Sequence, residues 1–283
     1  MTDAYKGDIL TRIITAVPAI VLALLCTWYG GAAFTALVIF AGLLLVYEGW
    51  TLARSRADSR VSIAPLVVLS LVLVLAVWLV SLGLLVALLM IVGVGLLTLA
   101  WSTLTGRGFL FVAFLIWLIV PLTIMLWVRD DAQWGLITVV ALFAVSWLSD
   151  TGAYCAGRLI RGPRLAPRLS PNKTWAGLMG GMIGGIIAAI IIGLWVIGYM
   201  GISVSLTSLA IMGALSAVLG QTGDIVESAL KRWAGVKDSG KIMPGHGGLF
   251  DRVDGLLFVT LGAGLIALWR FKEPPVSGIL LWP

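Results

Sequence analysis

Residues 64–101 read APLVVLSLVLVLAVWLVSLGLLVALLMIVGVGLLTLAW, without a single charged side chain. A helix of about 20 apolar residues crosses a hydrocarbon core of about 30 Å, so this run is long enough for two crossings. Ser81 to Gly83 is the only plausible turn within it, because glycine accepts backbone conformations that interrupt a helix. The stretch therefore predicts two membrane-spanning helices joined by a short turn.

The composition of the whole chain agrees with this interpretation. Of 283 residues, 60% are hydrophobic and 11% charged, whereas about 25% are charged in an average soluble domain. The bilayer must therefore serve as the solvent, and we expect an all-α, polytopic integral membrane protein. Nine spans are predicted, near residues 10–28, 32–49, 64–82, 84–101, 109–127, 134–154, 176–199, 204–229 and 253–270.

The distribution of basic residues predicts the orientation, because Lys and Arg accumulate in loops on the cytoplasmic side. A cytoplasmic N-terminus leaves only three of the 19 basic residues outside, namely Arg129, Arg270 and Lys272. An odd number of spans then places the C-terminus outside. The first span has no cleavage pattern after it and is interpreted as retained. We expect a multi-pass protein of the inner (cytoplasmic) membrane.

A break in composition occurs between Ser228 and Asp254. The segment holds five Lys or Arg, three Asp and the only His of the chain. Each charge at the centre of a bilayer costs roughly 2.5 to 3.5 kcal/mol on insertion scales, so such a cluster indicates a functional requirement. A polyanionic ligand together with a metal ion is a requirement of this kind.

A polar stripe leads into this segment. Asp224, Glu227, Ser228 and Lys231 are spaced i, i+3, i+4 and i+7, so they share one face of a helix. That face must line a polar interior or a water-filled cavity, because it is too polar for lipid. We expect the eighth helix to continue into the charged segment, and the glycine-rich stretch after it to form a loop.

Two further polar patches precede the stripe. Asp150 is expected to close the sixth span, and Tyr154 follows one helical turn later. Ser170 and Pro171 are interpreted as the start of the seventh helix. Lys173 and Thr174 would then offer donors beside the free amide groups of that helix, which is a natural anion site.

The available ligands predict magnesium and not zinc. The acids supply carboxylate oxygens, whereas a single His cannot make a usual structural zinc site. Magnesium takes one or two protein carboxylates and completes its shell with water and substrate phosphates. Asp224 and Asp251 are the preferred ligands, with Asp150 and Asp254 as further candidates. Cations around such an ion suit phosphoryl or nucleotidyl transfer.

These residues resemble the C-terminal signature of the phosphatidate cytidylyltransferases, or CDP-diacylglycerol synthases. The matching positions are Ser228, Lys231, Arg232, Lys237, Asp238, Pro244, His246, Gly247, Gly248, Asp251, Arg252 and Asp254. Patches at 149–154, 157–158 and 170–175 are similar as well, so the resemblance covers about 149–256. Ala176 and Met243 depart from the usual residues of the family, which are Glu and Leu or Ile; a catalytic role of that Glu therefore cannot be transferred.

The resemblance implies that CTP and phosphatidic acid give CDP-diacylglycerol and pyrophosphate. Asp224, Lys237 and Asp251 would be catalytic. The substrate-binding residues would be Lys173, Thr174, Ser228, Lys231, Arg232, Lys241, His246 and Arg252. His246 would act either as an acid toward pyrophosphate or as a hydrogen-bond partner of a phosphate. The cofactor would be Mg²⁺, and the site would face the cytoplasm.

The same interpretation divides the chain into two regions. Residues 1–133 would form a transmembrane scaffold of five helices. Arg12 and Glu48 are nearly the only ionisable residues within these five predicted spans. Residues 134–283 would form the catalytic region of four helices with charged cytoplasmic loops. The small residues of GGMIGG at 180–185 permit close helix packing. A homodimer is expected, and no nucleic-acid partner, because no basic soluble domain is present.

Two alternatives stay open. A CTP-dependent cytidylyltransferase acting on another lipid phosphate would have the same local chemistry. An anion transporter would also combine many spans with intramembrane charges, but transporters usually place their site between internal repeats. The first five spans have no counterpart of the charged clusters, so the sequence disfavours transport.

Overall fold

The computed structural model describes residues 3–56, 63–105, 112–245, 247–270 and 276–281. The chain packs as two compact units, each discontinuous in sequence. Unit 1 comprises Met1–Trp127 and Leu230–Val253, and unit 2 comprises Val128–Ala229 and Asp254–Pro283. The charged segment therefore packs largely with the N-terminal helices. The functional regions expected at 1–133 and 134–283 stay predictions.

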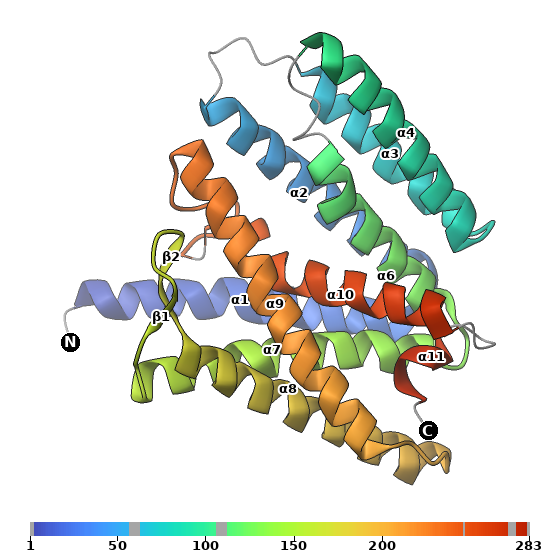
Figure 1. Cartoon of the computed structure of the whole chain (residues 1–283), viewed down its shortest axis with the longest axis vertical. Helices are drawn as coiled ribbons and strands as arrows, with labels where there is room; N and C mark the ends of the chain where they lie inside the picture. The colour runs from blue at the N-terminus through green and yellow to red at the C-terminus, as the bar shows by residue number, and fades with distance from the viewer. Residues whose placement is uncertain (1–2, 57–62, 106–111, 246, 271–275, 282–283) are drawn as a thin grey trace. The chain divides into compact units, whose positions relative to one another are not determined.

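Unit 1 consists mainly of apolar helices (Figure 1). They are α1 (Asp3–Tyr29), α2 (Gly31–Arg56), α3 (Ala64–Val80), α4 (Leu84–Thr105), the π-helical turn η1 (Leu115–Ile119) and most of α6 (Val120–Asp130). The predicted turn between α3 and α4 is confirmed, since the Leu82 amide donates to the Leu79 carbonyl (2.9 Å) and Gly83 has a φ of +127°. A side chain at Gly83 would be strained in this conformation.

Unit 2 contains the remaining helices and a short hairpin. Its elements are α7 (Gly135–Leu159), β1 (Arg164–Ala166), β2 (Ser170–Thr174), α8 (Trp175–Trp195), η2 (Val196–Met200), most of α9 (Leu206–Ala234), most of α10 (Phe250–Arg270) and α11 (Ser277–Leu280). Residues 230–234 of α9 and 250–253 of α10 belong to unit 1. All three boundaries between the units thus fall inside helices, namely α6, α9 and α10.

Glycines bring α7 and α8 together, and the two helices lie side by side in Figure 1. A methyl group at Gly180 would collide with Ala156 and with the Gly152 backbone. One at Gly184 would lie 2.8 Å from the carbonyl carbon of Leu148. The small residues of the GGMIGG segment therefore allow backbone-to-backbone packing, as expected for small residues at helix interfaces in membranes.

The apolar helices support the membrane assignment. Within the described residues, six helices are long and apolar enough to span a bilayer. Three shorter apolar helices, Ile14–Tyr29, Ala64–Val80 and Leu84–Leu99, lie where further spans are predicted. The chain is therefore a mainly helical integral membrane protein. The count of nine spans and the orientation of the ends stay predictions.

Two predicted boundaries are wrong. Residues 170–174 form a strand that pairs with β1, and α8 begins only at Trp175. The Thr174 hydroxyl oxygen caps this helix by accepting from the Gly177 amide (3.0 Å), so threonine and not Ser170 supplies the start signal. Helix α7 continues to Leu159, which leaves Asp150 well inside the helix. The expected extension of the eighth helix into the charged segment is confirmed, because α9 ends at Ala234.

Candidate active site

The carboxylate of Asp251 organises the charged loop of unit 1. It lies in the first turn of α10, and its side chain is only 7% exposed. Its Oδ1 accepts from the Lys231 ammonium at 2.5 Å. Its Oδ2 accepts from the Ser239 amide and hydroxyl, both at 3.0 Å, and from the Gly248 amide at 2.8 Å. One carboxylate thus connects the end of α9, the loop and the start of α10.

The glycines of this loop make room for that carboxylate. Gly247 has a φ of +87°, and a Cβ there would lie 2.8 Å from Asp251 Oδ2. Its amide and carbonyl pair with the carbonyl and amide of Met243, at 3.1 and 2.9 Å, which closes a tight turn. The glycine-rich sequence therefore has two physical reasons: a left-handed backbone and the close approach of an acid.

Glu48 is the site residue that sequence reasoning missed. It lies in α2 and is 1% exposed. Its Oε1 accepts from the Leu249 amide (2.9 Å), and its Oε2 accepts from the Phe250 amide (2.8 Å) and the Ser239 hydroxyl (3.2 Å). The sequence predicts this helix to be part of the scaffold and assigns no role to Glu48. The sequence nevertheless contains an indication of its role, since a lone acid in an apolar span indicates a functional site.

A second charged cluster lies in unit 2. Lys173 at the end of β2 donates to Asp224 Oδ2 on α9 at 2.5 Å, with side chains 19% and 28% exposed. Asp254 is buried on α10, and its neighbouring charges are Asp224, Glu227 and Lys173. Gly255 leaves space for Asp224, because a Cβ there would lie 3.1 Å from Asp224 Oδ1. The cluster thus holds three acidic side chains and one basic side chain. This excess of negative charge would attract a cation.

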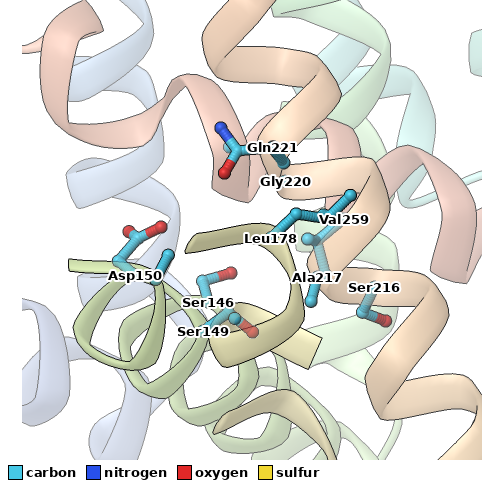
Figure 2. A pocket seen from close by; sticks show the side chains of 12 residues that line it. Ser146, Ser149, Asp150, Leu178, Ser216, Ala217, Gly220, Gln221 and Val259 are labelled. Carbon is cyan, nitrogen blue, oxygen red and sulfur yellow. The ribbon is translucent and has the colours of Figure 1, made fainter. Parts of the chain in front are cut away.

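A small cavity with polar and apolar lining lies beside α7 in the same unit (Figure 2). The cavity is lined by residues of α7, α8, α9 and α10, among them Asp150. Ser146 Oγ, Ser149 Oγ and Gln221 Nε2 line it, are buried, and have no hydrogen-bond partner among the described residues. Unsatisfied buried polar groups of this kind are rare in native proteins and call for a ligand or water.

The remaining candidates are more exposed. Arg232, Lys237, Lys241 and Arg252 are exposed, and Ser228 is half-buried on α9. Arg232 donates to the Val236 carbonyl at 3.5 Å near the end of α9. His246 lies outside the described residues. The structure thus pairs Lys173 with Asp224 and Lys231 with Asp251, and leaves several cations accessible to a ligand.

The donor set fits magnesium better than a metal held by protein alone. Within the described residues, no three His, Cys, Asp or Glu side chains form a group that would hold a metal ion. Magnesium needs only one or two carboxylates when phosphates and water complete its shell. Asp224 and Asp251 each already balance one cationic group at 2.5 Å. Each carboxylate thus already accepts from a lysine ammonium.

Comparison of the sequence with known proteins identifies the protein family. The family model described as "Cytidylyltransferase family" matches residues 10–268. A phosphatidate cytidylyltransferase of Brucella suis biovar 1 is 38% identical over 98% of this chain and 99% of its own length. That of Brucella abortus biovar 1 is 39% identical over the same shares. That of Staphylococcus saprophyticus is 36% identical over 44% of this chain and 46% of its own length.

The chain belongs to the cytidylyltransferase family. The match covers the N-terminal helices as well as the charged segment, so it extends well beyond the 149–256 on which the resemblance rests. Membership sets aside the transporter alternative, because the matched relatives are named as transferases.

Proposed function

We propose that this chain transfers the cytidylyl group of CTP to phosphatidic acid and releases pyrophosphate. The observation that carries the proposal is the pairing of Lys231 with Asp251, at the loop of the family signature, in a chain that matches phosphatidate cytidylyltransferases over nearly its full length. The bilayer would hold the acyl chains, so only the lipid phosphate needs to enter a polar site.

The chemistry is a substitution at phosphorus. An oxygen of the lipid phosphate attacks the α-phosphorus of CTP, a new P–O bond forms, and the bond to the bridging oxygen of the β-phosphate breaks. The nucleophile is already anionic, so no side chain has to serve as a nucleophile. The main task of the protein is to bring two polyanions together and to stabilise the departing pyrophosphate.

The lysines suit this task. Lys231 and Ser228, one turn apart on α9, are proposed to bind the lipid phosphate, and Lys173 is proposed as a further phosphate-binding residue. Thr174 accepts a bond from Gly177 and still has its hydroxyl proton to donate to a phosphate oxygen. The exposed cations would neutralise the triphosphate, namely Arg232, Lys237, Lys241 and Arg252. His246 is proposed as a phosphate-binding residue.

Magnesium is proposed as the cofactor. Asp224 and Asp251 are the proposed ligands, and Asp150 and Asp254 are the further candidates. When bound, the ion would neutralise phosphate charge and align the leaving group. At either carboxylate, binding would require an oxygen that now accepts from a lysine, which would free that ammonium group for a substrate phosphate.

Location and topology complete the proposal. We propose that the chain crosses the inner membrane nine times, with its N-terminus and its active site on the cytoplasmic side. We also propose that it forms a homodimer. Among the described residues, six of the predicted spans overlap helices long and apolar enough to cross a membrane and three overlap shorter apolar helices, and the basic residues favour this orientation. In a variant lacking Cys26 and Cys155, a cysteine in place of Glu273 should react with an impermeant maleimide from outside; labelling only from inside would overturn the orientation.

The assay of function is direct. Purified protein in lipid should convert CTP and phosphatidic acid to CDP-diacylglycerol and pyrophosphate in a reaction that requires Mg²⁺. Parallel reactions with a polyprenyl phosphate and an ether-linked phosphatidic acid test the acceptor. Faster turnover of the polyprenyl phosphate would assign another lipid substrate. Loss of CTP-dependent turnover with every acceptor would overturn the proposal.

The cavity of unit 2 gives a separate prediction. Ser149→Ala should leave thermal stability unchanged or slightly higher, because the hydroxyl has no partner to lose among the described residues. If a polar group of a substrate enters the cavity, KM for that substrate should rise about 5- to 10-fold, the equivalent of a single hydrogen bond of roughly 1 kcal/mol. Kinetics with varied CTP and varied lipid, beside a melting curve, provide the measurement. An unchanged KM for both substrates would leave the cavity outside the substrate site.

A further inference from the structure

A buried acid from the second helix caps the helix that carries Asp251. Glu48 is 1% exposed, and its two oxygens accept from the consecutive amides of Leu249 and Phe250. Helix α10 begins at Phe250, so these amides are among the first donors of the helix and lack partners within it. Glu48 therefore acts as an N-cap supplied by a segment about 200 residues earlier in the chain.

The same acid also reaches Asp251 through one shared group. The Ser239 hydroxyl lies 3.2 Å from Glu48 Oε2 and 3.0 Å from Asp251 Oδ2. It has one proton and two acceptor oxygens beside it, and the Ser239 amide adds a second bond to Asp251. The orientation of the Asp251 carboxylate thus depends on a loop that Glu48 holds.

Two glycines show that the loop is shaped around Glu48. A Cβ at Gly240 would lie 2.6 Å from Glu48 Oε1, and its three nearest atoms all belong to Glu48. A Cβ at Gly248 would lie 2.6 Å from Glu48 Oε2 and also collide with Ser239. The adjacent Phe250 is fully buried, with its ring 4.7 Å from that of Trp117. Packing and hydrogen bonding together fix the position of this acid.

We propose that Glu48 is a positioning residue of the reaction: it holds Ser239, Leu249 and the start of α10 in place, and thereby orients the Asp251 carboxylate toward Lys231 and the proposed Mg²⁺. The inference rests on the proposed function. It assigns a role in the site to the helix that was interpreted as scaffold. Glu48 itself would touch neither substrate nor metal, because its oxygens are taken by the loop and the helix.

The first test is Glu48→Gln, which keeps the shape of the side chain. Its amide offers one acceptor oxygen and turns an NH₂ group toward a backbone N–H, so at least one cap bond is lost. We expect kcat to fall roughly 10- to 100-fold, and the Mg²⁺ concentration for half-maximal rate to rise, as when a group that orients a metal ligand is removed. KM for phosphatidic acid should stay unchanged. Glu48→Asp, which keeps the charge, should recover part of the rate.

A matched control separates positioning from stability. Val46→Ala shortens a side chain on the same helix that is as deeply buried as that of Glu48. It should lower the melting temperature while the Mg²⁺ dependence stays as in the wild type. If Val46→Ala and Glu48→Gln shift the Mg²⁺ dependence equally, the role of Glu48 is merely structural and the proposal is overturned.

A second pair tests the contact itself. Gly240→Ala should reduce turnover in the wild-type background, because its methyl group collides with Glu48. In the Glu48→Ala background the same substitution should cause no further loss, since the colliding atoms are gone. Equal losses in both backgrounds would overturn the inference. A wild-type protein without CTP turnover would instead overturn the proposed function, so the two failures are distinguishable.

Discussion

Asp251→Asn and Asp224→Asn are each expected to reduce CDP-diacylglycerol formation by at least about 100-fold at saturating CTP, the scale on which loss of one electrostatic contact to a transition state acts. Each substitution removes a negative charge that now balances a lysine at 2.5 Å and that is proposed to bind Mg²⁺. Turnover measured over a Mg²⁺ titration provides the readout. Excess Mg²⁺ should restore part of the activity if the carboxylate is a ligand.

The control for this pair is Asp130→Asn. It makes the same change of charge at an exposed residue at the end of α6, and turnover should match that of the wild type. Asp251→Asn also leaves the mostly buried Lys231 without its anionic partner, so melting curves must accompany the kinetics. Full activity of both Asp variants at every Mg²⁺ concentration would refute the metal assignment.

Gly184→Val is expected to prevent folding of unit 2. A Cβ at this position would lie 2.8 Å from the carbonyl carbon of Leu148 and 3.2 Å from the amide nitrogen of Ser149. Backbone atoms cannot rotate away as a side chain can, so helices α7 and α8 would have to separate. Overpacking of a core commonly costs about 1 to 3 kcal/mol, and the rigid neighbours here predict the upper end or beyond.

The matched control is Gly198→Ala, in the π-helical turn that continues α8. A Cβ there meets nothing within 4 Å. This variant should fold as the wild type does, with equal or slightly higher stability, because alanine favours helix over glycine. The measurements are the yield of monodisperse protein in detergent and its melting temperature. Wild-type behaviour of Gly184→Val would show that α7 and α8 do not need their close approach.

The helices could be predicted from the sequence because each depends on a local property. Apolar length defines the spans, and Gly83 marks the turn between α3 and α4 even inside an unbroken apolar run. The polar spacing from Asp224 to Lys231 predicts one helical face, and α9 spans all of it. The β1–β2 hairpin was missed because Ser170 and Pro171 are also good helix-start residues.

The site was only partly predictable because its pairings are long-range. The sequence identified Lys173, Asp224, Lys231 and Asp251 as members, but no spacing rule states which lysine pairs with which acid. The role of Asp251 as the anchor of a loop depends on the positions of Ser239 and Gly248, which only the structure shows. Glu48 lies 191 residues before Ser239, too far for any local pattern to connect them.

The cap that Glu48 provides also sets an order for biosynthesis. Its partner amides at Leu249 and Phe250 are made 201 and 202 residues later, and at about 5 to 20 residues per second that interval lasts roughly 10 to 40 s. Throughout this time the second helix carries an acid whose permanent partners do not yet exist. The second helix can therefore reach its final state only after Leu249 and Phe250 have been made, and a chain that stalls before Leu249 lacks the two amides that this acid caps.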